Sequence, residues 1–234
     1  MLWITIIIVA VVLLFLYSVL PNIVTRLFHW FAVARGPSVS SVALTFDDGP
    51  DPDYTPRLLD QLHEYNIKAT FFVLGEKAQA YPDLVRRMLR EGHDVQIHGW
   101  KHQLVPILGP RQTVRQFKET QSLLKREFGV SAVLYRPTWG LSNLVTLLTS
   151  FKSVKLVTWS IMVGDWRVTQ SEVLQDRIVR HLHKGAVIVL HDSDKTAGAE
   201  DKAPEQVISL IEGLAQTVRD RGYQFIVFKD WVKF

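Results

Sequence analysis

Two adjacent carboxylates, Asp47 and Asp48, end a short apolar run and are followed by the turn residues Gly49-Pro50. Successive side chains of a strand point to opposite sides, so the two acids are expected to have different neighbours and different tasks. Carboxylates at a strand end, beside a loop, are well placed to take part in catalysis. A solvated turn with a helix cap is the alternative, and it would be favoured for such a pair seen alone.

His98 and His102 are four residues apart, so both imidazoles can lie on one side of a helical turn and share a metal ion. With one carboxylate they would form a His, His, Asp set that leaves positions open for water and substrate. The chain has no cysteine, which excludes disulfides, thiolate catalysis and cysteine-based zinc sites. Any metal must therefore be held by histidine and carboxylate, although a lone His-x-x-x-His is more often a surface coincidence.

Other reactive side chains follow the ends of apolar runs that resemble strands. In chain order the segments are Asp47-Asp48, His98 to His102, Arg136 to Gly140, Asp165-Trp166 and His191-Asp192. The carboxyl ends of parallel strands meet on one face of a barrel, so these segments are expected to lie together. Taken singly, the arginine could pair on the surface, Asp165 could form a loop turn, and the tryptophans could be core residues.

The elements that would position these segments alternate along the chain. Strands are predicted at 42–46, 68–73, 94–97, 132–135, 154–159, 186–190 and 223–228, and helices at 55–65, 76–91, 111–127, 141–151, 171–183 and 204–221. Strict alternation predicts parallel strands with crossover helices. Seven strands in one series favour a closed or nearly closed barrel. The fold class is therefore α/β, a distorted (β/α)7 barrel.

The five segments also stand in the order of the five motifs of the NodB-like polysaccharide deacetylases, carbohydrate esterase family 4, which this chain resembles over roughly residues 41 to 230. The resemblance implies a hydrolase that removes N-acetyl groups and depends on one divalent metal ion, zinc in the first place, with cobalt or manganese as alternatives. It matches Asp48, His98 and His102 to the three metal ligands.

The resemblance implies roles for further residues. Asp47 matches the general base that activates water, and Arg136 matches the residue that holds this base in place. His191 matches the general acid that protonates the departing amine, with Asp165 as the carboxylate that orients it. The positions matched to substrate binding are Trp139, through its backbone N–H as oxyanion donor, and Trp166 and Val189, in the acetate-methyl pocket.

Three departures from the family pattern concern the surroundings of the site. Gly99 stands where serine or threonine is usual, so a hydrogen bond that supports the site is expected to be missing. Val189 stands where leucine is common, and residues 162–164 are less polar than the usual segment before Asp165. These changes affect pocket shape and substrate preference rather than the catalytic set. Residues 194–201 are expected to form a mobile polar loop bordering the groove.

The first residues predict a membrane segment. Leu2 to Leu20 contains no charge, and nineteen such residues are about enough to cross a hydrocarbon core as a helix. A cleaved signal peptide is the alternative, but a basic n-region and a small-residue cleavage signal are both missing. The predicted organisation is an anchor at 1–21, a juxtamembrane amphipathic stretch and linker at 22–40, and a deacetylase domain at 41–234. Residues 22–34 could lie in the membrane surface, extend the spanning helix or pack on the domain.

Composition narrows the partners. The net charge of +4 is scattered among acids, so nucleic-acid binding is not expected, whereas a mildly basic surface suits an anionic envelope polymer. The predicted function is removal of N-acetyl groups from N-acetylhexosamine residues of a cell-envelope glycan, with peptidoglycan as the leading candidate. The alternatives are an esterase or deacetylase acting on a lipid-linked or other acylated sugar, and a glycan-binding module without catalysis.

Membrane orientation draws on two conflicting arguments. Arg26 and Arg35 follow the apolar segment, and the positive-inside rule then argues against export of the C-terminal side. The chemistry of the family usually faces the cell wall. A single-pass membrane protein with an extracytoplasmic catalytic domain is therefore predicted from the resemblance, not from charge.

Overall fold

The computed structural model describes residues 1–232, without the side chains of residues 150–152. Its strands are β1 (Ala32–Val33), β2 (Ser41–Asp47), β3 (Thr70–Leu74), β4 (Asp94–Gly99), β5 (Leu134–Tyr135), β6 (Lys155–Val157), β7 (Ile161–Met162), β8 (Ala186–His191) and β9 (Gln224–Ile226). They form one sheet in the order β1-β6-β5-β4-β3-β2-β8-β7, with β9 beside β2. Each of these strand pairs is parallel.

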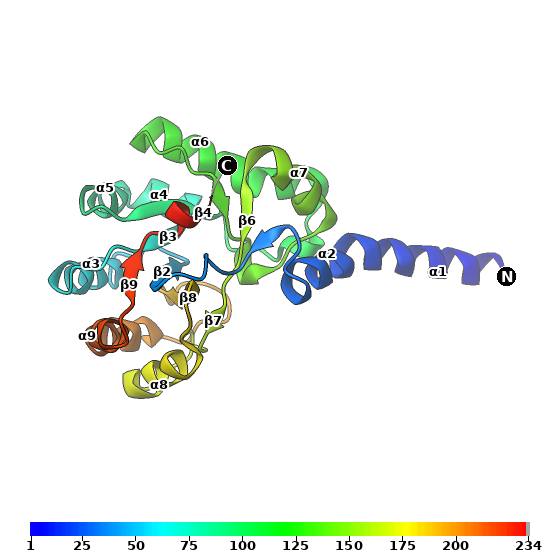
Figure 1. The fold of residues 1–234 in the computed structure, drawn as a ribbon. Coiled ribbons are helices and arrows are strands. Elements are labelled where there is room, and N and C mark those ends of the chain that lie inside the picture. Colours follow the sequence, from blue (N-terminus) through cyan, green and yellow to red (C-terminus); the bar gives the residue numbers. More distant parts are fainter. Residues whose placement is uncertain (233–234) are drawn as a thin grey trace.

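Helices surround the outer face of the curled sheet (Figure 1). The α-helices are α3 (Thr55–Glu64), α4 (Gly75–Ala80), α5 (Pro82–Arg90), α6 (Pro110–Phe128), α7 (Leu144–Ser153), α8 (Ser171–His181) and α9 (Ala203–Asp220), and the 3-10 turns are η3 (Val105–Ile107), η4 (Thr138–Gly140) and η5 (Phe228–Trp231). Each of the larger helices buries one apolar face, as Val207, Ile211 and Leu214 of α9 do. Hydrophobic burial on these faces holds the helices against the strands.

Strand β2 lies at the centre of the sheet and ends at the site. Its residues Val42 to Asp47 are buried, and it is hydrogen-bonded to β3, β8 and β9. A parallel strand covered on both faces is almost wholly apolar, which explains the run Val42-Ala43-Leu44. Since Asp47 is the last residue of β2, the core itself fixes where the first carboxylate stands.

The predicted fold class, a distorted parallel α/β barrel, is confirmed, and the barrel is open. The sheet order ends at β1 and β7, and no ladder joins those two strands within residues 1–232. Neither was predicted: each has only two residues, and no helix separates β1 from β2 or β6 from β7, so both fall outside the alternation of strands and helices. The single helix predicted at 76–91 is divided at Tyr81 because Pro82 lacks the N–H that a continuous helix would need.

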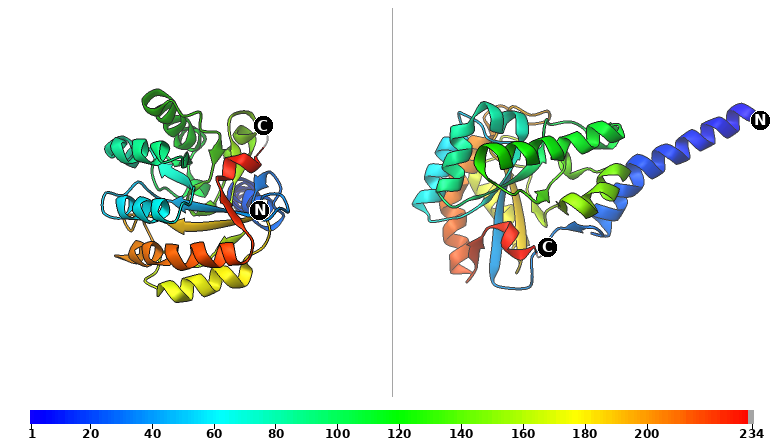
Figure 2. Two further views of the ribbon diagram at one scale, coloured as in Figure 1. Left: turned by 60° about the vertical axis from the view of Figure 1, so that its left-hand side comes forward. Right: turned by 90° about the horizontal axis from the view of Figure 1, so that it is seen from above.

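The N-terminal segment is a single helical rod that projects from the barrel (Figures 1 and 2). It comprises α1 (Leu2–Leu14), the π-helical turn η1 (Phe15–Val19), α2 (Leu20–Asn22) and a second π-helical turn, η2 (Ile23–Leu27). In the described part of the chain, this rod is the one helix long and apolar enough to cross a membrane. Of the three alternatives for residues 22–34, helix extension and packing on the domain both occur, since Thr25 is buried and β1 pairs with β6.

The core predicts a clear contrast between two leucines. Leu214 on α9 is fully buried, so Leu214→Ala should lower the free energy of unfolding by about 3 kcal/mol through lost burial and a cavity. Leu148 on α7 is 61% exposed, and Leu148→Ala should change it by less than about 0.5 kcal/mol. Urea unfolding of the detergent-solubilised chain measures both. Equal losses in the two variants would contradict the assignment of α9 to the core.

Candidate metal centre and active site

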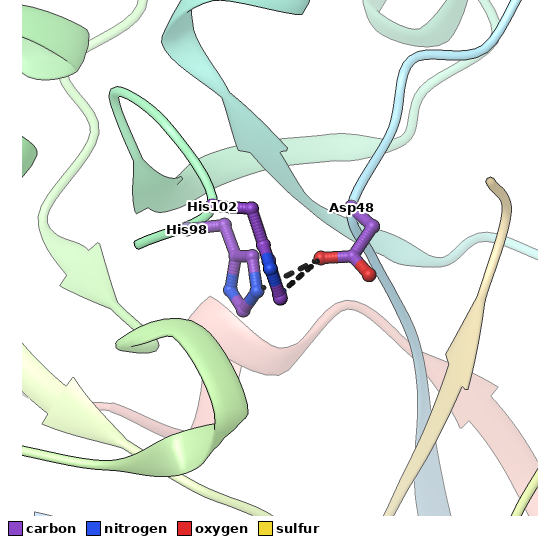
Figure 3. Close-up of side chains that lie close together, drawn as sticks. All are labelled: Asp48, His98 and His102. Atoms are coloured by element: carbon purple, nitrogen blue, oxygen red, sulfur yellow. Dashed lines mark ion pairs between the residues drawn. The ribbon is translucent and has the colours of Figure 1, made fainter. Parts of the chain in front are cut away.

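Three side chains from two strand ends converge on one point (Figure 3). Asp48 follows β2, whereas His98 lies in β4 and His102 in the loop after it. Oδ1 of Asp48 lies 3.1 Å from Nε2 of His98 and 3.3 Å from Nε2 of His102. One ligand atom from each residue lies within 4.8 Å of the other two. The three residues can therefore reach a common ion.

The backbone at this point is unusual. Asp48 has a φ of +78° and Trp139 a φ of +54°, in the left-handed region that non-glycine residues seldom adopt. The turn at Asp48 brings both acids to one cavity, although consecutive strand residues point apart. Their neighbours nevertheless differ, because Asp48 faces the histidines while Asp47 accepts a hydrogen bond from Arg136. Such backbone conformations persist where surrounding contacts hold them, often at functional sites.

The chemistry of this cluster fits a divalent metal ion. Oδ1 of Asp48 is buried and has no hydrogen-bond partner within the described chain, so an unsatisfied anionic ligand is aimed at the two imidazoles. Burial alone would raise the pKa of Asp48, but its contact with His98 and the nearby histidines lower it below the usual range. Burial lowers the pKa of His102 to about 4 despite the opposing charge of Asp48. One carboxylate and two imidazoles suit zinc and similar ions.

Asp47 is held by a buried arginine. Nη1 of Arg136 donates to Oδ1 of Asp47 over 2.7 Å and to Oγ1 of Thr45 over 2.8 Å. Its Nη2 donates to the carbonyl of Thr158, and its guanidinium lies 4.1 Å from the ring centroid of Phe72. Arg136 is fully buried, so these partners compensate its guanidinium for the lost contact with water. The arrangement keeps one oxygen of Asp47 occupied and leaves Oδ2 for other partners.

His191, the last residue of β8, forms a second pair with Asp165. Nδ1 of His191 lies 3.1 Å from Oδ2 of Asp165, and the backbone N–H of His191 donates to the same oxygen over 2.7 Å. Burial disfavours the charged imidazole, but the neighbouring carboxylate outweighs it and raises the pKa of His191 to about 10. His191 therefore holds a proton at neutral pH, and its Nε2 remains free to give that proton to a ligand.

One cavity of about 460 Å³ connects these groups. It is lined by Asp47, Asp48, His98, His102, Trp139, Trp166, Val189 and His191, together with residues from the N-terminal rod and the 196–199 loop. Arg136 and Asp165 are the two residues of the predicted site that do not line it. They lie behind the cavity wall and bind Asp47 and His191, so all ten predicted residues belong to one connected arrangement.

Two supporting residues were missed by the sequence analysis. Thr196, in the loop expected only to border the groove, donates from Oγ1 to Oδ2 of Asp48 over 2.7 Å. Gln116 of α6 accepts hydrogen bonds from the backbone N–H groups of Trp100 and Lys101, between the two histidines. Thr196 follows the end of β8, which carries the motif residue His191, and this position could have indicated that Thr196 lies near the site. Gln116 is an internal helix residue without any such signal.

Gln116 also explains why glycine is acceptable at position 99. Gly99 has a φ of +151°, and a Cβ there would stand 3.0 Å from Oε1 of Gln116. The carbonyl of Gly99 accepts a hydrogen bond from Thr120. The histidine loop is thus supported from α6, rather than by a side chain at position 99. Gly99 itself supplies no side-chain hydrogen bond to the site, as expected from its residue type.

Metal content should separate the two adjacent acids. Asp48→Ala removes the anionic ligand and should abolish binding of one equivalent of zinc or cobalt, whereas Asp47→Asn should retain the ion. Dialysis followed by elemental analysis, with cobalt absorption as a second measurement, tests this. Retention of a full equivalent by Asp48→Ala would refute the triad.

The contact from Thr196 makes a narrower prediction. Thr196→Val keeps the shape of the side chain but removes the donor to Asp48, and it should weaken metal affinity by roughly 10- to 100-fold. Thr149→Val is the matched control, since Oγ1 of Thr149 donates to the carbonyl of Val145 within α7. Competition with a fluorescent chelator measures both affinities. Identical affinities in the two variants would show that Thr196 does not orient Asp48.

Comparisons with known proteins agree with this geometry. The chain is 34% identical over 190 residues to the peptidoglycan-N-acetylmuramic acid deacetylase PdaC of Bacillus subtilis, a match that covers 81% of this chain and 38% of PdaC. It is 33% identical to a chitooligosaccharide deacetylase of Sinorhizobium fredii, over 80% of this chain and 90% of that protein. The chain thus spans well under half of PdaC but most of the shorter relative.

A solved structure is similar over nearly the same region. The Bc1960 peptidoglycan N-acetylglucosamine deacetylase superimposes with a TM-score of 0.80 at 27% identity, covering 88% of this chain and 95% of that one. The sequence profile of the family described as polysaccharide deacetylase matches residues 34–156, more than half of the chain. On these matches, the chain belongs to the polysaccharide deacetylase family.

Proposed function

We propose that this protein is a metal-dependent hydrolase that removes N-acetyl groups from N-acetylhexosamine residues of a cell-envelope glycan. The observation that carries the proposal is the single cavity onto which the Asp48, His98 and His102 cluster, the acid Asp47 and the protonated His191 all open. Relatives named as peptidoglycan deacetylases support peptidoglycan as the first polymer to test. The membership of the family supports an amide-hydrolysing activity.

The residues divide the reaction between them. An ion held by Asp48, His98 and His102 would supply Lewis-acid chemistry and lower the pKa of a bound water to about 7. Asp47, held by Arg136, would accept the proton of the attacking water. His191, charged and oriented by Asp165, would donate its proton to the departing nitrogen, which cannot leave as an anion.

The remaining lining residues have positioning roles in the proposal. The backbone N–H of Trp139 would donate to the carbonyl oxygen of the acetyl group as negative charge develops on it. Trp166 and Val189 line the same cavity and would enclose the acetyl methyl group. The ring of Trp139 packs against that of His102, with ring centroids 4.1 Å apart. The proposed substrate-binding residue Trp139 is therefore in direct contact with the proposed metal ligand His102.

Zinc is the proposed ion, with cobalt or manganese as alternatives, because the donor set contains two imidazoles and one carboxylate. We further propose a single-pass anchor at 1–21, a juxtamembrane stretch and linker at 22–40 and a deacetylase domain at 41–234, with that domain outside the cytoplasm. An exposed apolar helix at the N-terminus and relatives that act on peptidoglycan support this placement. A topology reporter fused to the C-terminus tests the orientation.

Acetate release is the direct test of the function. The detergent-solubilised chain is freed of metal by chelation, restored with zinc, cobalt or manganese, and incubated with N-acetylglucosamine oligomers and with purified peptidoglycan. Metal-dependent release of acetate supports the deacetylase. Metal binding with release only from O-acetylated sugars would indicate an esterase, and binding of glycan without any release would indicate a non-catalytic module.

The pH profile should report the pair formed by His191 and Asp165. His191 must be protonated to act as an acid, so the rate should fall as pH rises through its raised pKa. Asp165→Asn removes the charge that raises this pKa and should move the alkaline limb of kcat/KM to lower pH, with a loss of roughly 10²- to 10⁴-fold in rate. Asp176→Asn, an exposed change on α8, should leave the profile unaltered. An unmoved alkaline limb in Asp165→Asn would reject His191 as the acid.

A further inference from the structure

The N-terminal rod is attached to the barrel beside the catalytic cavity. The hydroxyl of Tyr17 donates to the carbonyl of Leu108, and the hydroxyl of Ser18 donates to that of Pro106 over 2.7 Å. These acceptors belong to the loop that follows β4, the strand that carries His98. The rod is therefore hydrogen-bonded to the edge of the barrel on which the metal ligands lie.

A second set of bonds fixes the rod to the loop after β5. Nδ2 of Asn22 donates to the carbonyl of Ser142, and the N–H of Ser142 donates to Oδ1 of Asn22, each over 2.8 Å. These two reciprocal hydrogen bonds fix the orientation of the rod relative to the barrel. Ser142 directly follows Leu141, which lines the catalytic cavity together with Trp139 and Gly140.

The apolar helix of the rod, Leu2–Leu27, includes the turns that are docked on the barrel. Residues 1–16 are exposed throughout, and contact with the barrel begins at Tyr17. Residues 2–16 would span only about 22 Å as a helix, less than the hydrocarbon thickness of about 30 Å. A membrane crossed by the whole apolar helix Leu2–Leu27 would therefore reach the docked turns, and with them the loops after β4 and β5.

The surface around the docked turns suits such a position. Its exposed apolar side chains are Leu27, Phe28, Trp30, Phe31, Leu104, Ile107, Leu144 and Leu148. Ile107 is 73% exposed at the tip of η3, directly beside η1 in the packing of the domain. Exposed aromatic and aliphatic groups beside an apolar helix are typical of a surface that enters the interfacial layer of a membrane.

Arg26 is a cation at the rim of the catalytic cavity. It comes from η2 of the rod, lines the cavity, and holds its guanidinium 5.7 Å from the ring centroid of Trp159. No ion pair joins it to a carboxylate within residues 1–232, and it is the one lysine or arginine among the lining residues of that range. An unpaired guanidinium in an aromatic rim favours an anion such as phosphate.

We propose that the substrate is an acetamido sugar carried by a membrane lipid through a phosphate ester, with Arg26 binding that phosphate. The docked rod holds the cavity at the membrane surface, where the sugar of such a lipid stands a short distance from the hydrocarbon. This inference rests on the proposed deacetylase function and narrows its substrate. Arg26 is a binding residue in this arrangement, because it contacts the carrier and not the acetyl group.

The geometry can be tested without activity, because the chain contains no cysteine. Ile107→Cys and Tyr81→Cys are each labelled with an environment-sensitive fluorophore and placed in vesicles of phosphatidylcholine and phosphatidylglycerol. Tyr81 lies between α4 and α5 in the chain, and these two helices lie on the side of the barrel away from α1 (Figure 1). The emission of the label at position 107 should shift to the blue, relative to the same fluorophore attached to a small thiol in buffer without detergent. The emission of the label at position 81 should not shift. Equal spectra at both positions would overturn membrane apposition.

The substrate is tested with full-length protein in the same vesicles, loaded with metal. The probes are N-acetylglucosamine joined by a phosphodiester to a polyprenol, the soluble tetramer of N-acetylglucosamine, and purified peptidoglycan. The inference expects kcat/KM for acetate release to be about tenfold or more higher for the lipid-linked sugar than for the tetramer. A tetramer or peptidoglycan used as well as the lipid-linked sugar would overturn the inference and leave the deacetylase function standing. No release from any probe would reject both.

Arg26→Gln isolates the phosphate contact. It should raise KM for the lipid-linked probe by about ten- to hundredfold with little change in kcat, and it should change KM for the tetramer, which has no phosphate, by a clearly smaller factor. Arg35→Gln is the matched control, since Arg35 is exposed in the same segment and does not line the cavity. An unchanged KM for the lipid-linked probe, or an equal loss on the tetramer, would overturn the role of Arg26.

Discussion

The buried ion pair between Arg136 and Asp47 is the interaction on which the site depends. A fully buried guanidinium is tolerated only with partners, and removing one member of such a pair typically costs about 3–5 kcal/mol. Arg136 follows β5 and binds Asp47 and Thr45 of β2, the carbonyl of Thr158 after β6, and the face of Phe72 on β3. The pair that orients the acid also ties four strands together at the edge that forms the cavity.

The charge of each titratable side chain in the cavity depends on its surroundings and not on its residue type alone. Asp48, His102 and His191 share one enclosure, yet burial keeps the pKa of His102 low while Asp165 keeps that of His191 high. A neutral imidazole can bind a metal, and a protonated one can donate a proton. Histidine therefore has opposite tasks at positions 102 and 191. At position 191 the deciding neighbour is Asp165, whose Oδ2 lies 3.1 Å from Nδ1 of His191.

The N-terminal rod connects the apolar helix outside the barrel directly to the catalytic cavity. Asn22 and Ser142 exchange two hydrogen bonds, and Arg26 lies in the wall of the cavity, so the segment is part of the catalytic surface. A flexible tether would let the domain reach any nearby polymer. A docked rod instead fixes the height and direction of the cavity relative to whatever holds the helix, which restricts the substrates that can approach.

The sequence by itself determined the parallel α/β class and seven of the strands, because strand alternation and helical period are local patterns. It also named the ten residues of the site, through the resemblance of its five strand-end motifs to a known family. Tertiary structure decided the rest. Strands β1 and β7 have two residues each and lie outside the alternation of strands and helices, and the left-handed turn that brings Asp48 beside Asp47 depends on surrounding contacts. Gln116 and Arg26 reach the site from segments without a motif, and the contact of Thr196 with Asp48 also depends on long-range packing.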